Sequence, residues 1–214
     1  MSVEEFKRLS ALGVATVYES AGRIGLIDIP LIQLLPGSRI AGPARTVRCA
    51  QDDNLMVHAV IEQIRPGEVL VLTMPEPAPV ALIGELLVTQ VKLKKAAGIL
   101  VDAAIRDVEE LKELGLPIWT RFIRAKGASK NKIGELNGIV SVGGIQIAPS
   151  DIIVLDADGG VCIKQDRVVE VLQASEARFE KEMIMRKKLE SGEKSYDLHG
   201  LRDLIEKKVR KIEP

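Results

Sequence analysis

The sequence contains little cysteine, and its two cysteines do not form a recognisable motif. Cys49 and Cys162 lie far apart, and they form neither a CxxC pair nor a disulfide framework of several spaced cysteines. Both lie in apolar runs, where a cysteine usually behaves as a small buried hydrophobic residue. We therefore expect two buried thiols and a protein that resides in a reducing compartment.

The chain also has no net charge, no long apolar run and few aromatic residues. Lys+Arg and Asp+Glu number 30 each, so the chain has no long-range field that would attract nucleic acid or an anionic membrane. No apolar stretch approaches the roughly 18 residues of a membrane span. Glu4 and Glu5 occur where a secretory leader would be basic and then apolar. We expect a cytoplasmic protein without a nucleic-acid or membrane partner. Aromatic residues make up 3% of the chain, while Lys, Glu and aliphatic residues are abundant, a weak indication of a thermophilic source.

Apolar residues make up 46% of the chain, enough for one domain with a substantial core. Helix-like and strand-like segments alternate and strands then cluster, which predicts an α/β fold with a β-rich second half. We expect a single domain over residues 1–214, with a helical arm over about 167–214. The helices are expected over 3–21 (interrupted near Gly13), 54–64, 84–97, 107–114, 167–189 and from 195. The strands are expected over 46–50, 69–73, 98–103, 118–122, 140–147, 151–156 and 160–163.

Two short segments carry groups that suit the chemistry of a 2-oxo acid. Gly84–Leu87 begins a predicted helix, and Arg106–Asp107 follows a predicted buried strand, with twenty residues between Glu85 and Arg106. A helix that returns along a strand brings its own start near the far end of that strand. Both segments are therefore expected at one pocket, at the carboxyl edge of a sheet.

Each group in these segments has a possible role in that pocket. Unpaired backbone N–H groups at a helix start can hold a carboxylate, and Gly84 would let it approach closely. The Arg106 guanidinium can stabilise a keto oxygen that becomes negative, and Asp107 is a hard ligand for Mg²⁺ or Mn²⁺. Glu85 can hold a metal-bound water. A simpler explanation also exists, because Asp107 can act only as a helix cap and Glu85 can merely complement a helix dipole.

The chain resembles the RraA-like family and its metal-dependent pyruvate aldolases over nearly its whole length. The acidic residue at 85, the twenty-residue interval and Arg106-Asp107 match the D/E-x20-R-D signature of that family. Several further segments resemble its 4-carboxy-4-hydroxy-2-oxoadipate and 4-hydroxy-4-methyl-2-oxoglutarate aldolase/oxaloacetate decarboxylase branch. These are residues 13–19, 53–58, 65–71, 148–159 and 192–202.

The resemblance implies a swivelling β/β/α-type fold with a C-terminal helical extension, and a homo-oligomer that is a trimer or a dimer of trimers. It places the metal ligand on Asp107, the substrate arginine on Arg106, and the carboxylate-binding turn on residues 84–87 (Gly84, Glu85, Leu86 and Leu87). A glutamate on the last long helix would reach the metal-water shell of a neighbouring subunit. Glu182 is the best match for it, with Glu180 as the alternative. One departure is Ala103 in place of a usual glycine, which we expect to narrow the pocket.

Two further segments remain open at the level of sequence. Asn54 and His58 lie four residues apart on one predicted helix, so both can face a substrate. His58 would contact a distal carboxylate or transfer a proton, although a lone histidine on such a helix is as often a surface residue. Residues 125–130 contain glycine and lysine, but they lack the spacing of a phosphate-binding loop, so we reject that role.

The resemblance implies retro-aldol cleavage of 4-hydroxy-2-oxo acids to pyruvate, with oxaloacetate decarboxylation through the same pyruvate enolate. The substrates would be small 2-oxo acids, and the cofactor Mg²⁺ or Mn²⁺. The main alternative is a regulatory protein that binds RNA-processing machinery with little catalysis. Net neutrality and the presence of Glu85, Arg106 and Asp107 favour the enzyme. A methyltransferase is disfavoured, because no glycine fingerprint for a nucleotide follows the first strand.

Overall fold

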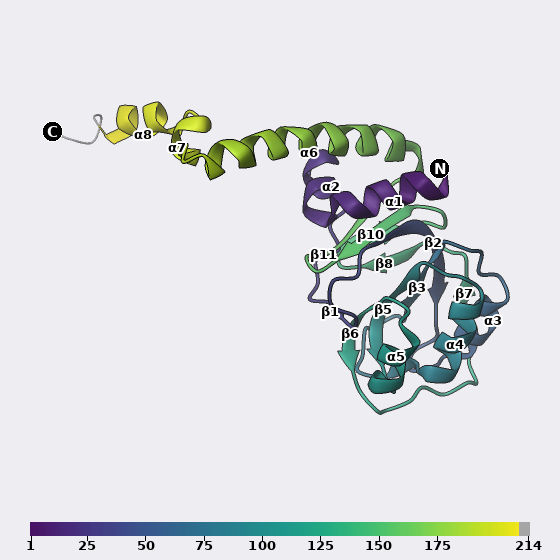
Figure 1. Ribbon diagram of the computed structural model, residues 1–214. Helices are drawn as coiled ribbons and strands as arrows, with labels where there is room; N and C mark the ends of the chain where they lie inside the picture. Colours follow the sequence, from purple (N-terminus) through teal and green to yellow (C-terminus); the bar gives the residue numbers. More distant parts are fainter. Residues whose placement is uncertain (210–214) are drawn as a thin grey trace. The chain divides into compact units, whose positions relative to one another are not determined.

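The computed structural model describes residues 1–209, which form two compact units (Figure 1). The first unit is Met1–Ser175, and the second begins at Glu176. The helices are α1 (Val3–Leu12), α2 (Val14–Ser20), α3 (Leu55–Ile61), α4 (Glu85–Leu93), α5 (Val108–Leu114), α6 (Val168–Glu190), α7 (Ser195–Leu198) and α8 (Leu201–Val209). Residues 210–214 of the expected arm lie outside the described residues.

Nine strands of the described chain form one sheet, and two more form a hairpin. The strands are β1 (Ile32–Gln33), β2 (Ile40–Arg48), β3 (Val69–Thr73), β4 (Ala81–Ile83), β5 (Gly98–Ile105), β6 (Ile118–Ile123), β7 (Glu135–Leu136), β8 (Val140–Val142), β9 (Ile145–Ile147), β10 (Ile152–Asp156) and β11 (Gly159–Ile163). The main path runs β1-β6-β5-β3-β2-β10-β11, while β4 pairs with β5 and β7 with β2. The hairpin is β8-β9.

The centre of the sheet is parallel, as the alternation of segments predicts. β2, β3, β5 and β6 run in one direction, and the chain crosses between them through α3, α4 and α5 (Figure 1). Parallel neighbours require such crossovers, because a tight turn can join only antiparallel strands. The carboxyl ends of these strands therefore meet at one edge of the sheet, which is where ligands bind in folds of this kind. The predicted α/β class is confirmed.

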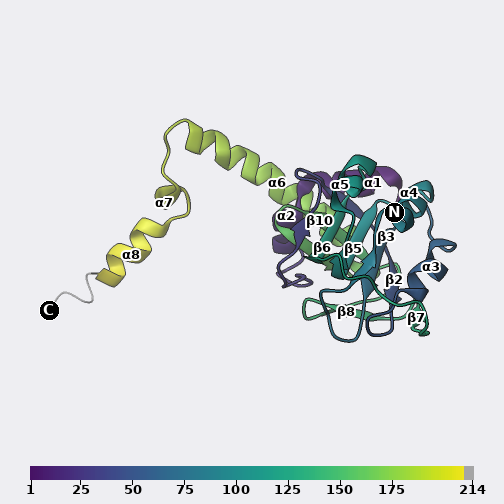
Figure 2. The same cartoon turned by 90° about the horizontal axis from the view of Figure 1, so that it is seen from below.

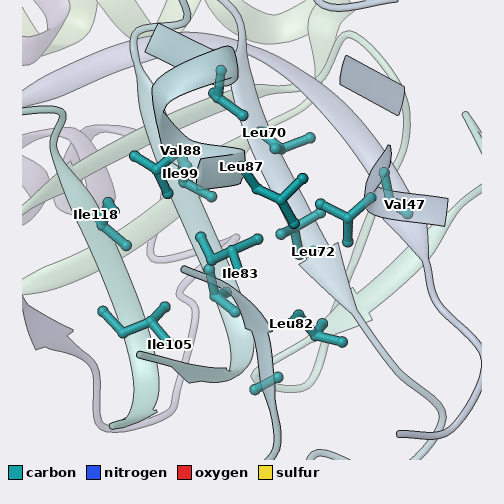
Figure 3. Packing of buried hydrophobic residues seen from close by; sticks show 14 of the residues in the cluster. Val47, Leu70, Leu72, Leu82, Ile83, Leu87, Val88, Ile99, Ile105 and Ile118 are labelled. Carbon is teal, nitrogen blue, oxygen red and sulfur yellow. The ribbon is translucent and has the colours of Figure 1, made fainter. Parts of the chain in front are cut away.

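Residues of the central strands pack alternately on the two faces of the sheet. In β3, Leu70 and Leu72 join the cluster beneath α3, α4 and α5, while Val69 and Val71 join a second cluster on the other face. Figure 3 shows the first cluster, with Leu87 of α4 packed among residues of the strands. A near-continuous apolar strand such as 69–73 is thus explained by burial on both faces.

A third cluster lies between β10, β11 and the two N-terminal helices. Val154 and Val161 pack against Leu9, Val14 and Val17. The interruption expected near Gly13 is confirmed, since Gly13 ends α1 with a φ of 83°. A side-chain oxygen of Asp156 then accepts a hydrogen bond from the Val14 backbone nitrogen at 2.8 Å, which caps α2.

Several strands differ from the prediction. The strand expected over 140–147 is two strands, β8 and β9, that pair as a hairpin, and the short strands β1, β4 and β7 were not predicted. The strand expected over 46–50 is longer at its start: it begins at Ile40, includes Gly42 and Pro43, and ends at Arg48. Residues 40–43 of β2 pair with β10, and residues 44–48 pair with β3. Pro43 thus lies at the last position before the strand changes partner, where a missing backbone N–H is tolerated.

The second unit contains the rest of α6, then α7 and α8. Figure 2 shows α7 as a short helix between α6 and α8. The arm expected from about residue 167 thus consists of the three helices α6, α7 and α8 within the described residues. None of the helices within residues 1–209 combines the length and apolarity that a membrane crossing requires.

Candidate functional site

The two segments singled out in the sequence emerge side by side from parallel strands. β4 pairs with the end of β5, with Ile83 opposite Ile105, and the Arg106 backbone nitrogen donates to the Ile83 carbonyl oxygen at 3.2 Å. The chain then continues into Gly84 after one strand and Asp107 after the other. Their proximity follows from β4, a strand that the sequence analysis did not predict.

Asp107 occupies the N-cap position of α5 but does not cap that helix. Its backbone is left-handed, with φ 61° and ψ 46°, and its side chain makes no capping hydrogen bond to α5. The Oδ2 atom instead accepts a hydrogen bond from the Glu85 backbone nitrogen at 3.0 Å, at the start of α4. A left-handed conformation at a non-glycine residue is uncommon and often marks a functional position. The simpler explanation of Asp107 as a cap of its own helix is therefore wrong.

Gly84 is the residue that allows this arrangement. A Cβ atom built on Gly84 would lie 2.2 Å from Asp107 Oδ2 and 3.1 Å from Arg106 Cγ. Any side chain here would displace the carboxylate and the arginine. Gly84 also precedes α4 without giving it a side-chain cap, so the Leu86 and Leu87 nitrogens at the helix start have no intrahelical acceptor. This helix start can bind an anion.

A cleft of about 280 Å³ opens in front of this helix start, and we call it the main cleft. It brings together seven of the residues predicted to form the site. These are Asn54, His58, Gly84, Leu86, Leu87, Arg106 and Asp107. The other lining residues are Ala81, Leu82, Ile83, Gln90, Gly127, Ala128 and Lys130. Asp107 is the one carboxylate among these residues.

Asn54 contributes an unpartnered buried acceptor to this cleft. Its residue is 8% exposed, and its Nδ2 atom donates to the Leu82 carbonyl oxygen at 2.9 Å. That bond fixes the orientation of the amide, because the reversed amide would place its oxygen against a carbonyl. Oδ1 is left without a partner among the described residues. A buried unsatisfied oxygen is costly, and a ligand donor would satisfy it. His58 lies one helical turn further along α3 and is exposed.

Asp53, next to Asn54, binds the loop of residues 129–132 through its carboxylate. Burial alone would raise the pKa of this carboxyl, but hydrogen bonds lower the pKa to about 2. The donors are the Asn131 backbone at 2.6 Å, the Ser129 hydroxyl at 2.6 Å, the Leu55 backbone at 2.9 Å and the Lys132 backbone at 3.1 Å. The carboxylate therefore holds residues 129–132 beside the start of α3.

The segment that leads into residues 129–132 also belongs to the site, which the sequence did not predict. Residues 125–130 were rejected as a phosphate loop, and no other role was assigned to them. Gly127, Ala128 and Lys130 nevertheless line the main cleft. A Cβ atom on Gly127 would lie 2.8 Å from Arg106 Nη1, so this glycine makes room for the guanidinium. The lysines of this segment, Lys126 and Lys130, could have indicated a place in the site, because an anionic substrate needs cations around it. By contrast, Ala103 is fully buried in the core and does not line the cleft, so the expected narrowing of the pocket is wrong.

The two glutamates predicted for the site have other partners in this chain. Glu85 is half-buried, and its Oε1 accepts a hydrogen bond from the Thr89 hydroxyl at 3.0 Å. Glu182 belongs to the second unit and forms an ion pair with Arg178 at 2.8 Å. Its expected role involves a neighbouring subunit and stays a prediction, as does the alternative with Glu180.

The side chains at this site offer few ligands for the divalent cation that the resemblance implies. No cluster of three His, Cys, Asp or Glu side chains that could hold a metal occurs within residues 1–209. The hydrogen bond described for the Asp107 carboxylate engages Oδ2, and Arg106 Nε lies 3.6 Å from the same oxygen. Mg²⁺ commonly binds through one or two carboxylates while keeping several waters. The residues present fit such an ion at Asp107, and they do not fit a closed cage of protein ligands.

Comparisons with known proteins identify the family to which the chain is similar. The family model RraA-like, described as aldolase/RraA, matches residues 14–162. A Halalkalibacterium halodurans protein named "Putative 4-hydroxy-4-methyl-2-oxoglutarate aldolase" is 36% identical over 140 residues, which cover 65% of this chain and 67% of that protein. The uncharacterized protein MJ0644 of Methanocaldococcus jannaschii is 31% identical over 121 residues, which cover 56% of this chain and 58% of that protein.

A solved structure is similar over a larger share of the chain. It is that of Streptomyces coelicolor RraAS2, described as an unusual member of the RNase ES inhibitor RraA protein family. The TM-score is 0.77 at 29% identity, and the match covers 87% of this chain and 97% of that one.

Proposed function

The chain belongs to the RraA-like family, and from this membership and the main cleft we propose that it is a carbon–carbon lyase that releases pyruvate from small 2-oxo acids. The predicted family and its α/β fold are both confirmed. A relative named as an aldolase supports a lyase. The observation that carries the proposal is the placement of Arg106 and Asp107 against the open start of α4.

Binding would begin with the carboxylate of the substrate. The free N–H groups of Leu86 and Leu87 lie at the positive end of α4, beside the cleft, and would donate hydrogen bonds to this carboxylate. The keto oxygen then lies near the guanidinium of Arg106. Gly84 keeps this approach open, because a side chain there would collide with both Arg106 and Asp107.

Cleavage would transfer electrons towards Arg106. A base removes the proton from the 4-hydroxyl oxygen, the C3–C4 bond breaks, and C4 becomes the carbonyl carbon of the second oxo acid. The bonding electrons form the C2–C3 double bond of a pyruvate enolate, whose oxygen Arg106 stabilises by a charge-assisted hydrogen bond. His58 lines the cleft and is the histidine available for the first proton transfer. A water ordered by Glu85, with Glu182 of a neighbouring subunit, would then protonate C3.

A Mg²⁺ or Mn²⁺ ion held by Asp107 would supply Lewis-acid stabilisation of the enolate oxygen. The charge of Asp107 suits this role, and its bond to the Glu85 nitrogen fixes its position. Oxaloacetate would lose CO₂ to give the same enolate. The further parts of the proposal are a homo-oligomer, either a trimer or a dimer of trimers, and a cytoplasmic location.

The test is pyruvate release from 4-hydroxy-4-methyl-2-oxoglutarate and from oxaloacetate, measured with Mg²⁺, with Mn²⁺ and with EDTA. The variant Arg106→Ala is expected to lose about 100-fold or more in kcat, the usual cost of removing one donor to a developing oxyanion. EDTA should abolish turnover, and added metal should restore it. Release that EDTA does not affect, or that Arg106→Ala retains, would contradict the proposal.

A second candidate is a regulator of RNA-processing machinery, favoured by the likeness to the RNase inhibitor family of RraAS2. A regulator has no need of the unpartnered Asn54 oxygen or of a carboxylate held at a helix start. Binding of a ribonuclease by metal-free protein, retained in Arg106→Ala, together with no pyruvate release, would support this candidate over the lyase.

A further inference from the structure

A second hollow adjoins the main cleft, and we call it the side pocket. Its volume is about 340 Å³, and its lining residues are Arg106, Asp107, Val108, Ile123, Arg124 and Ala125. Arg106 and Asp107 line the main cleft as well. A ligand whose reacting carbon lies at this pair can therefore extend into either hollow.

Arg124 is the one cation that the side pocket has and the main cleft lacks. Its backbone nitrogen donates to the Ile105 carbonyl oxygen at 3.0 Å, which fixes it beside Arg106. Its Nη1 atom donates to the Ile123 carbonyl oxygen at 2.7 Å. Among residues 1–209 no carboxylate forms an ion pair with Arg124, so most of its five N–H donors remain available. The side chain is exposed and reachable by a ligand.

The charges and shape of the side pocket fit a carboxylate on a short carbon chain. Two arginines, Arg106 and Arg124, line the side pocket with a single carboxylate, that of Asp107, which already accepts a hydrogen bond from the Glu85 nitrogen. The remaining side chains of the lining, Val108, Ile123 and Ala125, are apolar. An anionic group on a few methylene groups would satisfy Arg124 and cover this apolar surface.

We propose that Arg124 binds the distal carboxylate of the substrate and makes the site selective for dicarboxylic 2-oxo acids. This inference rests on the proposed function for the orientation of the substrate. The 2-oxo acid end lies at the start of α4 in the main cleft, the keto oxygen lies at Arg106, and the rest of the substrate passes the Arg106–Asp107 pair into the side pocket. Arg124 is thus a specificity-determining residue and takes no part in the bond cleavage.

A competing arrangement exists inside the main cleft. Lys130 lines that cleft, and among the described residues its side chain forms no ion pair, so it offers a second partner for the same carboxylate. The two arrangements make opposite predictions for Arg124→Ala and Lys130→Ala, and the experiment therefore includes both variants.

The test compares the binding of 2-oxoglutarate with that of 2-oxopentanoate by calorimetry in the presence of Mg²⁺. These ligands differ by one distal carboxylate in place of a methyl group, and their binding does not require turnover. Arg124→Ala should weaken 2-oxoglutarate about tenfold or more, the usual contribution of a hydrogen bond to a charged group, and leave 2-oxopentanoate unchanged. Arg124→Lys should give an intermediate loss, because it keeps the charge but not the fork.

Arg65→Ala is the matched control, since Arg65 is an exposed arginine in the turn before β3, at the opposite edge of the sheet. The proposal is overturned if Arg124→Ala weakens both ligands equally, if it weakens neither, or if Lys130→Ala alone removes the preference for 2-oxoglutarate. Failure of the lyase proposal would be seen separately, as absent pyruvate release with the preference for 2-oxoglutarate intact.

Discussion

The Oδ2 atom of Asp107 lies 3.0 Å from the backbone nitrogen of Glu85, so the aspartate at the start of α5 caps α4 instead. This bond joins the two segments that follow β4 and β5. It leaves the Leu86 and Leu87 nitrogens as the donors open to a substrate carboxylate. One side chain thereby serves both the structure of the site and its proposed metal chemistry.

The two roles of Asp107 can be separated by substitution. Asp107→Asn keeps an oxygen that can accept from Glu85 but loses the charge, whereas Asp107→Ala loses both. We expect both variants to lose about 100-fold or more of pyruvate release, because an amide is a poor ligand for Mg²⁺. Asp107→Ala should also lose about 1 kcal/mol of unfolding free energy, as for a lost helix cap. Urea titrations of wild type, Asp107→Asn and Asp107→Ala measure the unfolding free energy. Equal stability of the two variants would argue against the capping role.

Gly84→Ala should abolish the proposed pyruvate release without unfolding the protein. The new Cβ atom would stand 2.2 Å from Asp107 Oδ2, so the carboxylate must move. Misplacement of a catalytic group by about 1 Å can cost about 100-fold in rate. Gly127→Ala is the comparison, since its Cβ atom would meet only the flexible end of Arg106, at 2.8 Å. We expect a milder loss there, and similar activities for the two variants would contradict this explanation.

The stability of the protein should fall in acid through Asp53. Its pKa of about 2 in the folded state lies below the ordinary value of 3.8. A group with a lowered folded pKa contributes stability above its unfolded pKa and loses that stability as the pH falls through its folded pKa. The contribution of Asp53 should therefore be complete above about pH 4 and disappear towards pH 2.

Asp53→Asn should remove this part of the acid dependence and cost roughly 2 kcal/mol at neutral pH, because several charge-assisted hydrogen bonds are weakened. Urea unfolding of both proteins between pH 2 and 7 measures it. Asp52→Asn is the control, as asparagine tolerates the left-handed backbone of Asp52, with φ 57°. Parallel pH curves for wild type and Asp53→Asn would contradict the role of Asp53.

The sequence predicted the long elements better than the short ones. Strand 69–73 was predicted with its observed bounds, because four consecutive apolar residues and a threonine follow a turn. The three-residue β4 was missed, since it lies directly after the prolines of residues 75–79 and is too short for a periodic pattern. Yet β4 is the strand that brings Gly84 beside Arg106. The pattern of a helix that returns along a strand predicts that the two segments meet, whereas the structure brings them together by direct pairing of β4 with β5.

The sequence predicted only part of the site, because some of its residues are placed by contacts that are distant along the chain. Single residues such as Arg106 and Asp107 stand out by chemistry and spacing, whereas the contribution of Gly127 and Lys130 depends on the hydrogen bonds of Asp53 to residues 129–132. Such bonds span more than 70 positions of the chain and leave no local pattern. The left-handed backbone of Asp107 and its bond to Glu85 likewise cannot be deduced from an aspartate before a helix.

The central claim is that Arg106 and Asp107 stabilise a pyruvate enolate, and proton exchange at the pyruvate methyl group measures it directly. Pyruvate is incubated in D₂O with Mg²⁺ and wild-type protein, Arg106→Ala or Asp107→Ala, and loss of the methyl signal is followed by NMR. We predict exchange well above the metal-only background for wild type, and background rates for both variants and for wild type with EDTA. Exchange at background with the wild type, or exchange retained in Arg106→Ala, would contradict the account.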